Sequence, residues 1–425
     1  MSHFSERRLV GHDNFVRHNP ESDKFRIDRF HHIEFWCSDA TNVARRFQLA
    51  MGLDLVAKTD LSTGNKKYIS YVMKSNELTI VFTAPYSDKI DQTGSSEPHP
   101  GFTHDSIHRF IIDHANAVRA VAVRVEDAAI AFERAVANGG VPVLPPHELT
   151  CRYTGKTCTI SEIQLFGSGV LRFLSGDFTG PALPNYEPLP VTTSNCIGLT
   201  RIDHIVNNVP KLFEAVDYLM AATGFHEFSE FTADDVGTVD SGLNSMVLAN
   251  NNEFVLLPVN EPTFGTPRKS QIQNFLEHNN GAGVQHIALK TDDIFYTMRE
   301  MRKRTQIGGF DFMPAPGHDY YLKVPSRIGE NVLSASELEE LERLGLLADK
   351  DDQGVLLQVF TQPVGDRPTV FFEIIQRIGC DKDAVTGEHK EQAAGCGGFG
   401  KGNFSELFKS IENYEKMQDV VVPKQ

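Results

Sequence analysis

The sequence predicts an α+β fold in which one βαβββ module occurs four times, twice in each half of the chain. Three observations predict it. Strand-like apolar runs and an amphipathic helix recur in the same order in both halves. Polar turns separate these runs. A segment with four prolines, residues 180–190, divides the halves, and such proline density excludes helix and central strand.

The first module of each half begins with a strand and continues into a helix that ends at a glycine, Gly52 or Gly224. Glycine readily takes the backbone conformation that ends a helix. Two further strand-like runs follow the helix. The opening strands are 30–36 and 199–208, and the later runs are 67–74 with 77–84 and 242–250 with 253–259.

The second module repeats this order, and in the C-terminal half it is longer. An insertion near 317–353 accounts for the extra length, and we interpret its charged amphipathic helix, 334–347, as a surface decoration. The matching segments of the two halves are strands 118–127 and 284–293, helices 128–138 and 294–305, and closing strands 159–165 with 170–175 and 355–361 with 370–376.

Charge and composition exclude several classes of partner. The chain has 425 residues, and 41 Lys and Arg against 56 Asp and Glu give a net charge of −15. Nucleic acid and anionic membranes attract basic surfaces, so neither is an expected partner. The apolar runs are shorter than the ~20 residues of a membrane span. The first thirty residues contain five acids and no apolar stretch, so we expect no leader and a cytoplasmic location.

The six cysteines form no C-x-x-C pair, and we interpret them as free thiols in a reducing compartment. The repeat also predicts the domain organisation. We expect an N-terminal extension, a structural domain, a linker and a catalytic domain at residues 1–27, 28–180, 181–197 and 198–425.

Three ionisable residues lie at matching positions of apolar strands in the C-terminal half: His204, His286 and Glu373. Side chains alternate faces along a strand, so each shares its face with apolar neighbours. Ile202 and Val206, for example, are expected beside His204. A buried carboxylate is costly unless it is paired or bound to a metal. Two imidazoles and a carboxylate form the facial ligand set of non-haem Fe(II) oxygenases, which predicts a metal site.

The N-terminal half provides an internal comparison for this prediction. When His32 is aligned with His204, the other two ligand positions fall on Ala120 and Phe173. That half therefore keeps one possible ligand and lacks two, so we expect its role to be structural.

Other interpretations of the three residues stay open at this point. A single histidine on an apolar face is usually a hydrogen-bonded core residue, and Glu373 could pair with a buried Arg377. Zinc also accepts two histidines and a glutamate, although the helical H-E-x-x-H motif is absent. The segment 395–402 approaches a phosphate-binding loop but ends in Gly402 where Ser or Thr is required, so we do not expect nucleotide binding.

The C-terminal segment is a candidate lid. Glycines precede a helix expected at 403–416, which Asn403 can cap and whose apolar face includes Phe404. A docked terminal helix would show the same pattern. Because glycines allow such a segment to move, we interpret it as a closure over the metal site.

Several stretches resemble the 4-hydroxyphenylpyruvate dioxygenase family over nearly the whole chain. The most specific are Glu373-Ile-Ile-Gln-Arg377 and Gly400-Lys-Gly-Asn-Phe-Ser-Glu-Leu-Phe408, and Leu9-Val-Gly-His-Asp-Asn-Phe15 resembles the plant-type branch. The resemblance implies the vicinal oxygen chelate fold, here as two open-barrel domains built from the four modules. It also implies that His204, His286 and Glu373 bind one Fe(II) per subunit, with no catalytic residue beyond this iron centre.

The resemblance further implies a reaction and a pocket. The reaction converts 4-hydroxyphenylpyruvate and O2 to homogentisate and CO2 by oxidative decarboxylation, ring hydroxylation and side-chain migration, in a homodimer. By strand alternation Gln285 points away from the face of His286, which weakens its assignment. The implied substrate-binding residues are Ser245, Asn260, Gln271, Gln285, Gln358, Phe360, Phe371, Phe399 and Phe404.

Three alternatives share the fold: a hydroxymandelate synthase acting on the same substrate, an extradiol enzyme that cleaves catechols, and a binding protein without activity. The retained ligand set argues against the last, as does its contrast with the emptied N-terminal half. Pocket side chains decide between the two products of 4-hydroxyphenylpyruvate, and residue spacing does not.

Overall fold

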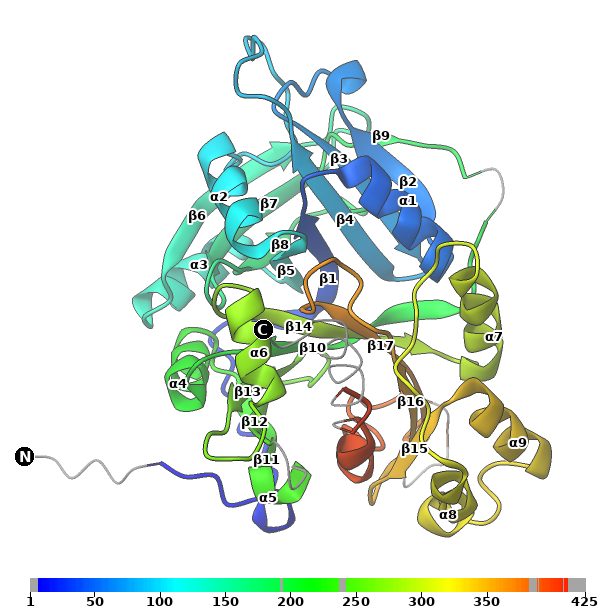
Figure 1. Ribbon diagram of the computed structural model, residues 1–425. Coiled ribbons are helices and arrows are strands. Elements are labelled where there is room, and N and C mark those ends of the chain that lie inside the picture. The colour runs from blue at the N-terminus through cyan, green and yellow to red at the C-terminus, as the bar shows by residue number, and fades with distance from the viewer. Residues whose placement is uncertain are drawn as a thin grey trace, which may run out of the picture.

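The computed structural model describes residues 7–191, 194–236, 242–381, 388, 390–407 and 409–411 (Figure 1). Two mixed sheets form its framework. The first has the strand order β6-β7-β8-β5-β1-β4-β3-β2-β9. Its strands are β1 (Ile27–Trp36), β2 (Asp54–Thr59), β3 (Tyr68–Ser75), β4 (Leu78–Pro85), β5 (Ala117–Val125), β6 (Pro142–Thr150), β7 (Thr157–Gln164), β8 (Val170–Ser175) and β9 (Glu187–Pro188).

The second sheet has the order β11-β12-β13-β10-β14-β17-β16-β15 and repeats the arrangement of the first. In each sheet the opening strands of two modules pair antiparallel at the centre, and the last strand of each module runs parallel beside them. Its strands are β10 (Leu199–Asn208), β11 (His226–Phe231), β12 (Leu243–Ala249), β13 (Leu256–Pro262), β14 (Gly283–Thr291), β15 (Leu347–Lys350), β16 (Gly354–Phe360) and β17 (Phe371–Gly379).

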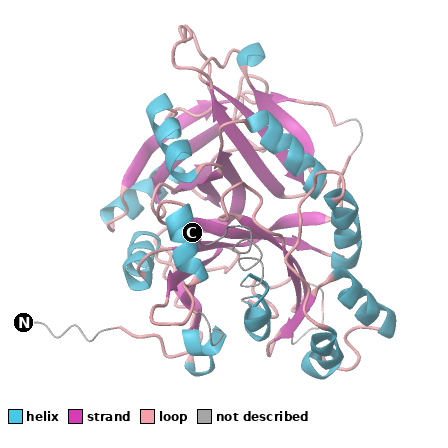
Figure 2. Cartoon of the chain, in the orientation of Figure 1, coloured by secondary structure: helices cyan, strands magenta, loops and turns pink. Residues whose placement is uncertain are grey.

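The helix that follows the opening strand of each module lies on the outer face of its curled sheet, whereas the C-terminal helix lies on the inner side of the second sheet (Figure 2). Local sequence sets their ends: α1 begins after Asp39, whose carboxylate accepts a hydrogen bond from the Asn42 amide, and ends at Gly52 with φ of +62°. A Cβ at Gly52 would lie 2.4 Å from the carbonyl oxygen of Asn195, so glycine is required there. The helices are α1 (Ala40–Met51), α2 (His104–His114), α3 (Ala128–Ala137), α4 (Leu212–Thr223), α5 (Ala233–Val236), α6 (Gln271–His278), α7 (Ile294–Thr305), α8 (His318–Ile328) and α9 (Ala335–Leu344).

The predicted fold class is confirmed: the modules are β1-α1-β2-β3-β4, β5-α3-β6-β7-β8, β10-α4-β11-β12-β13 and β14-α7-β15-β16-β17. The strands that the sequence pattern left out are β2, β6, β9, β11 and β15. Each lies at or next to the edge of its sheet. The alternation of apolar and polar residues is weakest there, because one side of an edge strand has little or no neighbouring strand to pair with. β6 contains three prolines, Pro142, Pro145 and Pro146, which edge strands tolerate.

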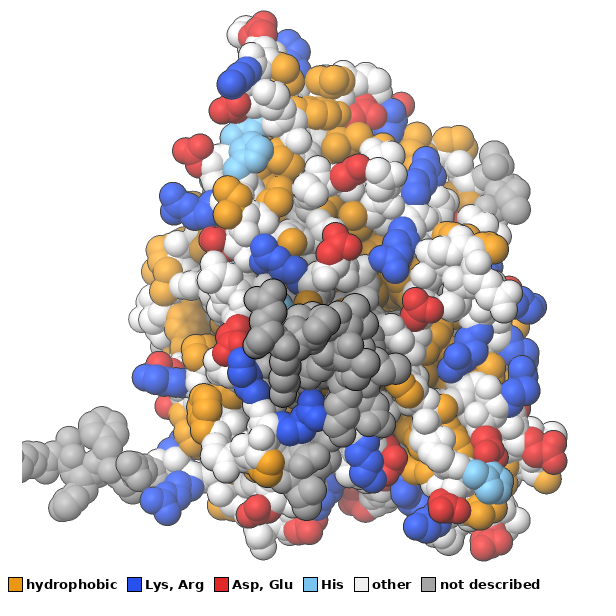
Figure 3. Space-filling model, in the orientation of Figure 1, with side chains coloured by type: hydrophobic (Ala, Val, Ile, Leu, Met, Phe, Trp, Pro, Cys, Tyr) orange, Lys and Arg blue, Asp and Glu red, His pale blue; other side chains and the backbone are white. Residues whose placement is uncertain are grey.

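One hydrophobic core joins the two halves. Rings from both sides meet where α1 contacts the second sheet: the ring centroids of Phe47 and Phe310 lie 4.9 Å apart, and those of Phe35 and Phe372 lie 6.4 Å apart. Over the outer helices, acidic and basic side chains are interspersed on the face drawn in Figure 3. Within the described residues, no helix is both long and apolar enough to span a membrane.

The insertion is more than a surface decoration. Its last residues form β15 at the edge of the second sheet, and α8 buries Tyr320. The Tyr320 hydroxyl donates 2.8 Å to Oδ1 of Asn403, and Asp349 in β15 accepts from the Gly402 amide at 2.8 Å. Both contacts hold the start of the C-terminal segment. The charged helix α9 does lie at the surface, opened by the capping box of Ser334 and Glu337.

Two further features differ from the sequence expectation or extend it. Cys380 and Cys396, 16 residues apart in the sequence, form a disulfide, so these two are not free thiols as expected. The N-terminal extension lies along β11: the amides of Val10 and Gly11 donate to Glu230, and the ring of His12 stacks on Phe231 at 4.9 Å.

Candidate metal centre

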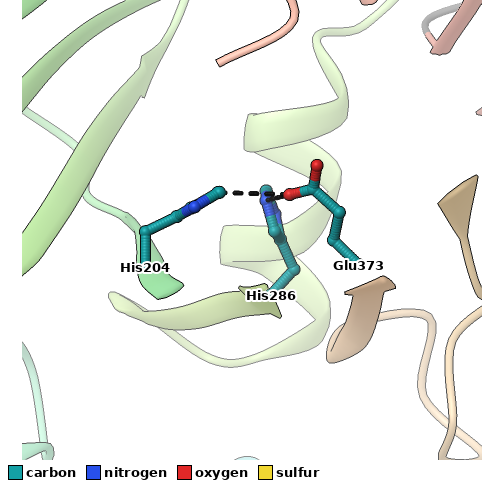
Figure 4. A group of neighbouring side chains, drawn as sticks. All are labelled: His204, His286 and Glu373. Atoms are coloured by element: carbon teal, nitrogen blue, oxygen red, sulfur yellow. Dashed lines mark ion pairs between the residues drawn. The ribbon is translucent and has the colours of Figure 1, made fainter. Parts of the chain in front are cut away.

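The three predicted ligands converge on one point inside the second sheet (Figure 4). His204 projects from β10, His286 from β14 and Glu373 from β17, three strands that are adjacent in the sheet. Nε2 of His204 lies 3.1 Å from Oε2 of Glu373, and Nε2 of His286 lies 3.6 Å from the same oxygen. The three donor atoms lie within 4.8 Å of one another, which is close enough to share one ion.

A β-bulge at Asp203 sets the direction of His204. Ile202 pairs with Leu289 and His204 pairs with Ala288, so Asp203 is the extra residue of β10. The bulge breaks the alternation expected from the sequence: Ile202 lies in the core beneath the helices, whereas His204 faces the inside of the sheet. Alternation alone therefore placed Ile202 on the wrong face.

Each imidazole is oriented by a neighbour in sequence. Nδ1 of His204 lies 2.9 Å from Oδ2 of Asp203, and Nδ1 of His286 lies 3.0 Å from Oε1 of Gln285. Because both partners accept, the Nδ1 atoms carry the protons. Nε2 is then the ring atom of each histidine that is available to a metal on the side of Glu373. Sequence reasoning missed Asp203, although an acid inside an apolar strand next to a candidate ligand was a usable signal.

The electrostatics of the centre favour an ionised carboxylate. Burial alone would raise the pKa of Glu373, but the hydrogen bonds and charges of His204 and His286 outweigh it and lower this pKa to about 2. Burial lowers the pKa of His286, which keeps that ring neutral. For His204, burial also acts to lower the pKa, but the carboxylates of Asp203 and Glu373 outweigh it and raise it.

Arg377 is buried as suspected, but its partner is not Glu373. Its guanidinium donates to both oxygens of Asp203, at 2.9 and 2.7 Å. Burial would raise the pKa of Asp203, and Arg377 and His204 together hold it well below its usual value. The negative charge of Glu373 is thus left facing the imidazoles, so the interpretation of Glu373 as the partner of Arg377 loses its basis.

A cavity of about 40 Å³ adjoins the three ligands. This volume holds a few water molecules and is too small for an aromatic 2-oxo acid. Its walls include side chains of the C-terminal segment, and Phe399 lies edge-on to His204 with 5.2 Å between ring centroids. Six of the predicted pocket residues line it: Ser245, Asn260, Gln358, Phe360, Phe399 and Phe404.

The other three predicted pocket residues, Gln271, Gln285 and Phe371, line a second cavity of about 330 Å³ between α6 and the start of β17. Phe371 stacks on the far face of His286, with 4.8 Å between ring centroids. Gln285 points away from the small cavity, as strand alternation predicts. The structure therefore does not bring these three residues to the open side of the ligands.

The lid helix expected at 403–416 is described only in part. Residues 404–407 and 409–411 are helical, and residues 408 and 412–416 lie outside the described residues. Asn403 does not cap this helix through its side chain, because its Oδ1 accepts from Tyr320 and Arg327 instead. Leu407 and Phe404 face the cavity, so the helix covers the site.

The strand pairing corrects one residue of the internal comparison. His204 pairs with Ala288, which pairs with Glu373, and the same two steps lead from His32 through Ala122 to Arg172. The counterpart of Glu373 is thus Arg172, not Phe173. The alignment by length was off by one residue, which moves a side chain to the other face.

Arg172 places a guanidinium where the second half gathers its ligands. It lies 2.9 Å from Nε2 of His32 and pairs with Glu34 and Glu162, each at 2.7 Å. Burial would raise the pKa of Glu162, but Arg172 and His99 outweigh it, so this carboxylate is ionised. The cation at this position belongs to the chain itself.

Comparison with known proteins agrees with this architecture. A family model described as the Glyoxalase/Bleomycin resistance protein/Dioxygenase superfamily matches residues 201–327. The solved structure of a mutant 4-hydroxymandelate synthase from Streptomyces coelicolor superposes with a TM-score of 0.72, covering 92% of this chain and 99% of that one. At 22% identity, this similarity shows the fold alone.

Sequence relatives are much more similar. The 4-hydroxyphenylpyruvate dioxygenase of Plectranthus scutellarioides is 57% identical over 419 residues, covering 97% of this chain and 94% of that protein. The protein of the same name from Arabidopsis thaliana is 54% identical, with coverages of 96% and 93%.

The paired modules and the superfamily match place the chain in the vicinal oxygen chelate class. The similarity to the plant proteins is more specific, since it runs through both sheets and the C-terminal segment. The chain belongs to the 4-hydroxyphenylpyruvate dioxygenase family.

Proposed function

We propose that this chain converts 4-hydroxyphenylpyruvate and O2 to homogentisate and CO2 with Fe(II) bound by His204, His286 and Glu373. The observation that carries the proposal is the convergence of these buried donors beside an aromatic-walled cavity, in a chain 57% identical to an enzyme of that name. Residues 198–425 would be the catalytic domain and 28–180 the structural one.

The donor set fits a divalent cation. Both Nε2 atoms and one carboxylate oxygen face the same point, and the rest of their surroundings is cavity. Neutral imidazoles and one carboxylate on one side leave positions for a bidentate 2-oxo acid. Fe(II), when bound, would supply the chemistry of dioxygen that no side chain of the site can perform.

The cavity walls support a role in holding the phenol ring. Oε1 of Gln358 is buried and accepts no hydrogen bond from the described residues, so a substrate hydroxyl can fill that need. Ser245 and Asn260 lie on the paired strands β12 and β13, directly opposite each other. Phe360 and Phe399 would hold the ring by offset or edge-on contact.

The C-terminal segment would admit the substrate and then exclude water. The small cavity means that Phe399, Phe404 or Leu407 must move before an aromatic acid enters. Their return would surround the bound substrate with apolar side chains, and a dry site prevents side reactions of the activated substrate.

Identifying the product tests the proposal. The protein loaded with Fe(II) and incubated with 4-hydroxyphenylpyruvate and O2 should release CO2 and homogentisate in equal amounts. Formation of 4-hydroxymandelate would show the alternative synthase, and no consumption of the acid would indicate a binding protein. The homodimer and the cytoplasmic location stay predictions, which gel filtration and cell fractionation test.

Replacing the carboxylate ligand tests the ligand assignment. Glu373→Gln keeps the size of the side chain but removes its charge, so bound Fe(II) and turnover should both fall at least about tenfold. Metal analysis after dialysis and the rate of O2 uptake measure the two effects. If the variant retains its iron and its turnover, Glu373 is not a ligand.

A further inference from the structure

Arg377 connects the metal centre to the segment that covers it. The side chain is completely buried at the end of β17. One edge of its guanidinium holds the carboxylate of Asp203, and its Nη1 donates to the backbone carbonyls of Cys396 and Gly398, the latter at 2.7 Å. All its polar contacts therefore lead either to Asp203 or to the covering segment.

On the first side, Asp203 connects Arg377 to His204, one of the proposed metal ligands. The same carboxylate that holds the guanidinium accepts the Nδ1 proton of His204. A carboxylate behind a ligating imidazole fixes the ring orientation and raises its basicity. Arg377 keeps this carboxylate charged and in place, since a buried carboxylate without a partner is costly.

On the second side, the same guanidinium holds the backbone of the covering segment, residues 395–400. Four of its glycines, Gly395, Gly397, Gly398 and Gly400, have positive φ values, so the backbone follows a path that side-chain-bearing residues rarely take. The segment is tied to β17 by the Cys380–Cys396 disulfide and to the site by Phe399, which packs edge-on against His204.

We propose that Arg377 is a positioning residue that couples the orientation of His204 to the closed position of residues 396–400. The inference rests on the proposed metal site, and it adds a function for a residue that touches neither metal nor substrate. Metal binding fixes His204, which fixes Asp203 and Arg377, and the guanidinium then holds the carbonyls of Cys396 and Gly398. Closure of the segment is in this way made conditional on an occupied centre.

The geometry requires arginine. Its planar fork presents five donors in fixed directions, enough for two carboxylate oxygens and two carbonyls. Lysine at this position could keep the charge opposite Asp203 but could not reach both groups. Arg377→Lys therefore separates the coupling from the charge balance of the buried pair.

The test uses the full-length protein, without substrate, and compares Arg377→Lys with a control on the neighbouring strand. Arg201 also lies near Asp203, at 3.9 Å, but makes no contact with residues 396–400 among those described, so Arg201→Lys is the matched variant. Hydrogen exchange of the amides of Gly398 and Gly402 reports closure, since both donate hydrogen bonds in the closed segment. Anaerobic competition with a chelator measures Fe(II) affinity.

In the wild type, Fe(II) should slow exchange of these two amides. In Arg377→Lys, exchange should be about tenfold faster and should no longer respond to Fe(II), with Fe(II) affinity about tenfold weaker. Arg201→Lys should match the wild type within about twofold. Exchange that still responds to Fe(II) in Arg377→Lys, or an equal change in Arg201→Lys, would overturn the proposal.

A second variant covers loss of folding. If Arg377→Lys does not fold, the pair Asp203→Asn with Arg377→Gln removes both buried charges together, and the same two measurements decide the question. Because neither measurement uses substrate, a different reaction product would leave this inference intact. Failure of Fe(II) to bind the wild type would overturn the proposed metal site instead.

Discussion

Single residues determine which charged groups balance one another at the centre of each sheet. In the second half, Glu373 and two imidazoles place three donor atoms where the proposed metal ion would bind. In the first half, Arg172 brings a cation within the chain and satisfies His32, Glu34 and Glu162. The guanidinium is fully buried, which such a group tolerates only with this many partners.

Removing that guanidinium should destabilise the protein without emptying the metal site. Arg172→Met removes the guanidinium from Glu34 and leaves Glu162 with His99 alone, and such a loss costs about 3–5 kcal/mol of unfolding free energy. Urea unfolding followed by the fluorescence of Trp36, the single tryptophan, measures the change. Bound Fe(II) should stay at one per chain. A variant as stable as the wild type would show that the cluster needs no cation.

The ligands could be predicted at this scale because ionisable residues stand out in apolar strands. The contact of Asp203 with Arg377 and the position of Arg172 could not be predicted, because both depend on backbone register. The bulge at Asp203 and the one-residue shift at Arg172 follow from pairing between distant strands, which local alternation does not contain.

Among the elements, the C-terminal segment shows most directly how glycine serves the site. Gly400 lines the cavity with φ of +75°, and a Cβ there would lie 2.2 Å from Oε1 of Gln358. Gly398 has nearly the same φ, +74°, but its Cβ would meet only Asp351, at an ordinary 3.6 Å. Gly398 and Gly400 therefore have the same left-handed backbone, but an added methyl group would clash with a neighbouring side chain only at Gly400.

This pair of glycines gives a controlled substitution. Gly400→Ala should displace Gln358 or the segment itself. We expect turnover to fall at least tenfold, since a rise of ~1.4 kcal/mol in the activation free energy is enough for that. Gly398→Ala carries a similar left-handed strain of about 1 kcal/mol but should keep most of its activity. Initial rates and melting temperatures of both variants measure the effects. Equal loss of activity would assign the effect to strain alone.

Strands and helices could be predicted from the sequence where both of their sides are buried. The central strands and the helix of each module were found from periodicity, whereas the strands β2, β6, β9, β11 and β15 and the helices α2 and α6 were not. The function of α8 also escaped prediction. Tyr320 binds Asn403, which is distant in sequence, and composition alone favoured a surface role for the insertion.

In the whole molecule, the continuous core should make the halves unfold together. Phe35 and Phe47 pack against Phe310 and Phe372, so opening one half exposes apolar surface of the other. The repeat in the sequence predicted the modules but not this interface, because an aromatic residue on an outer face does not reveal its partner.

Metal binding in the second half should therefore stabilise the first. Fe(II) at about 1,000 times its dissociation constant adds about 4 kcal/mol to the unfolding free energy. If unfolding is cooperative, the urea midpoint reported by Trp36 in β1 rises with it, although Trp36 belongs to the other sheet. Anaerobic titrations with and without Fe(II) compare the midpoints. If the urea midpoint reported by Trp36 does not change with Fe(II), the two halves unfold independently.

The N-terminal extension has a consequence for the timing of assembly. Residues 7–24 contact residues 217–253, for example where the Lys24 amide donates to the carbonyl of Thr223 at 2.8 Å. A ribosome makes the extension first and its partners some two hundred residues later. The extension therefore has none of these partners until the whole first sheet has been synthesised. Phe231, on which the ring of His12 stacks, is therefore covered by a segment that was synthesised long before it.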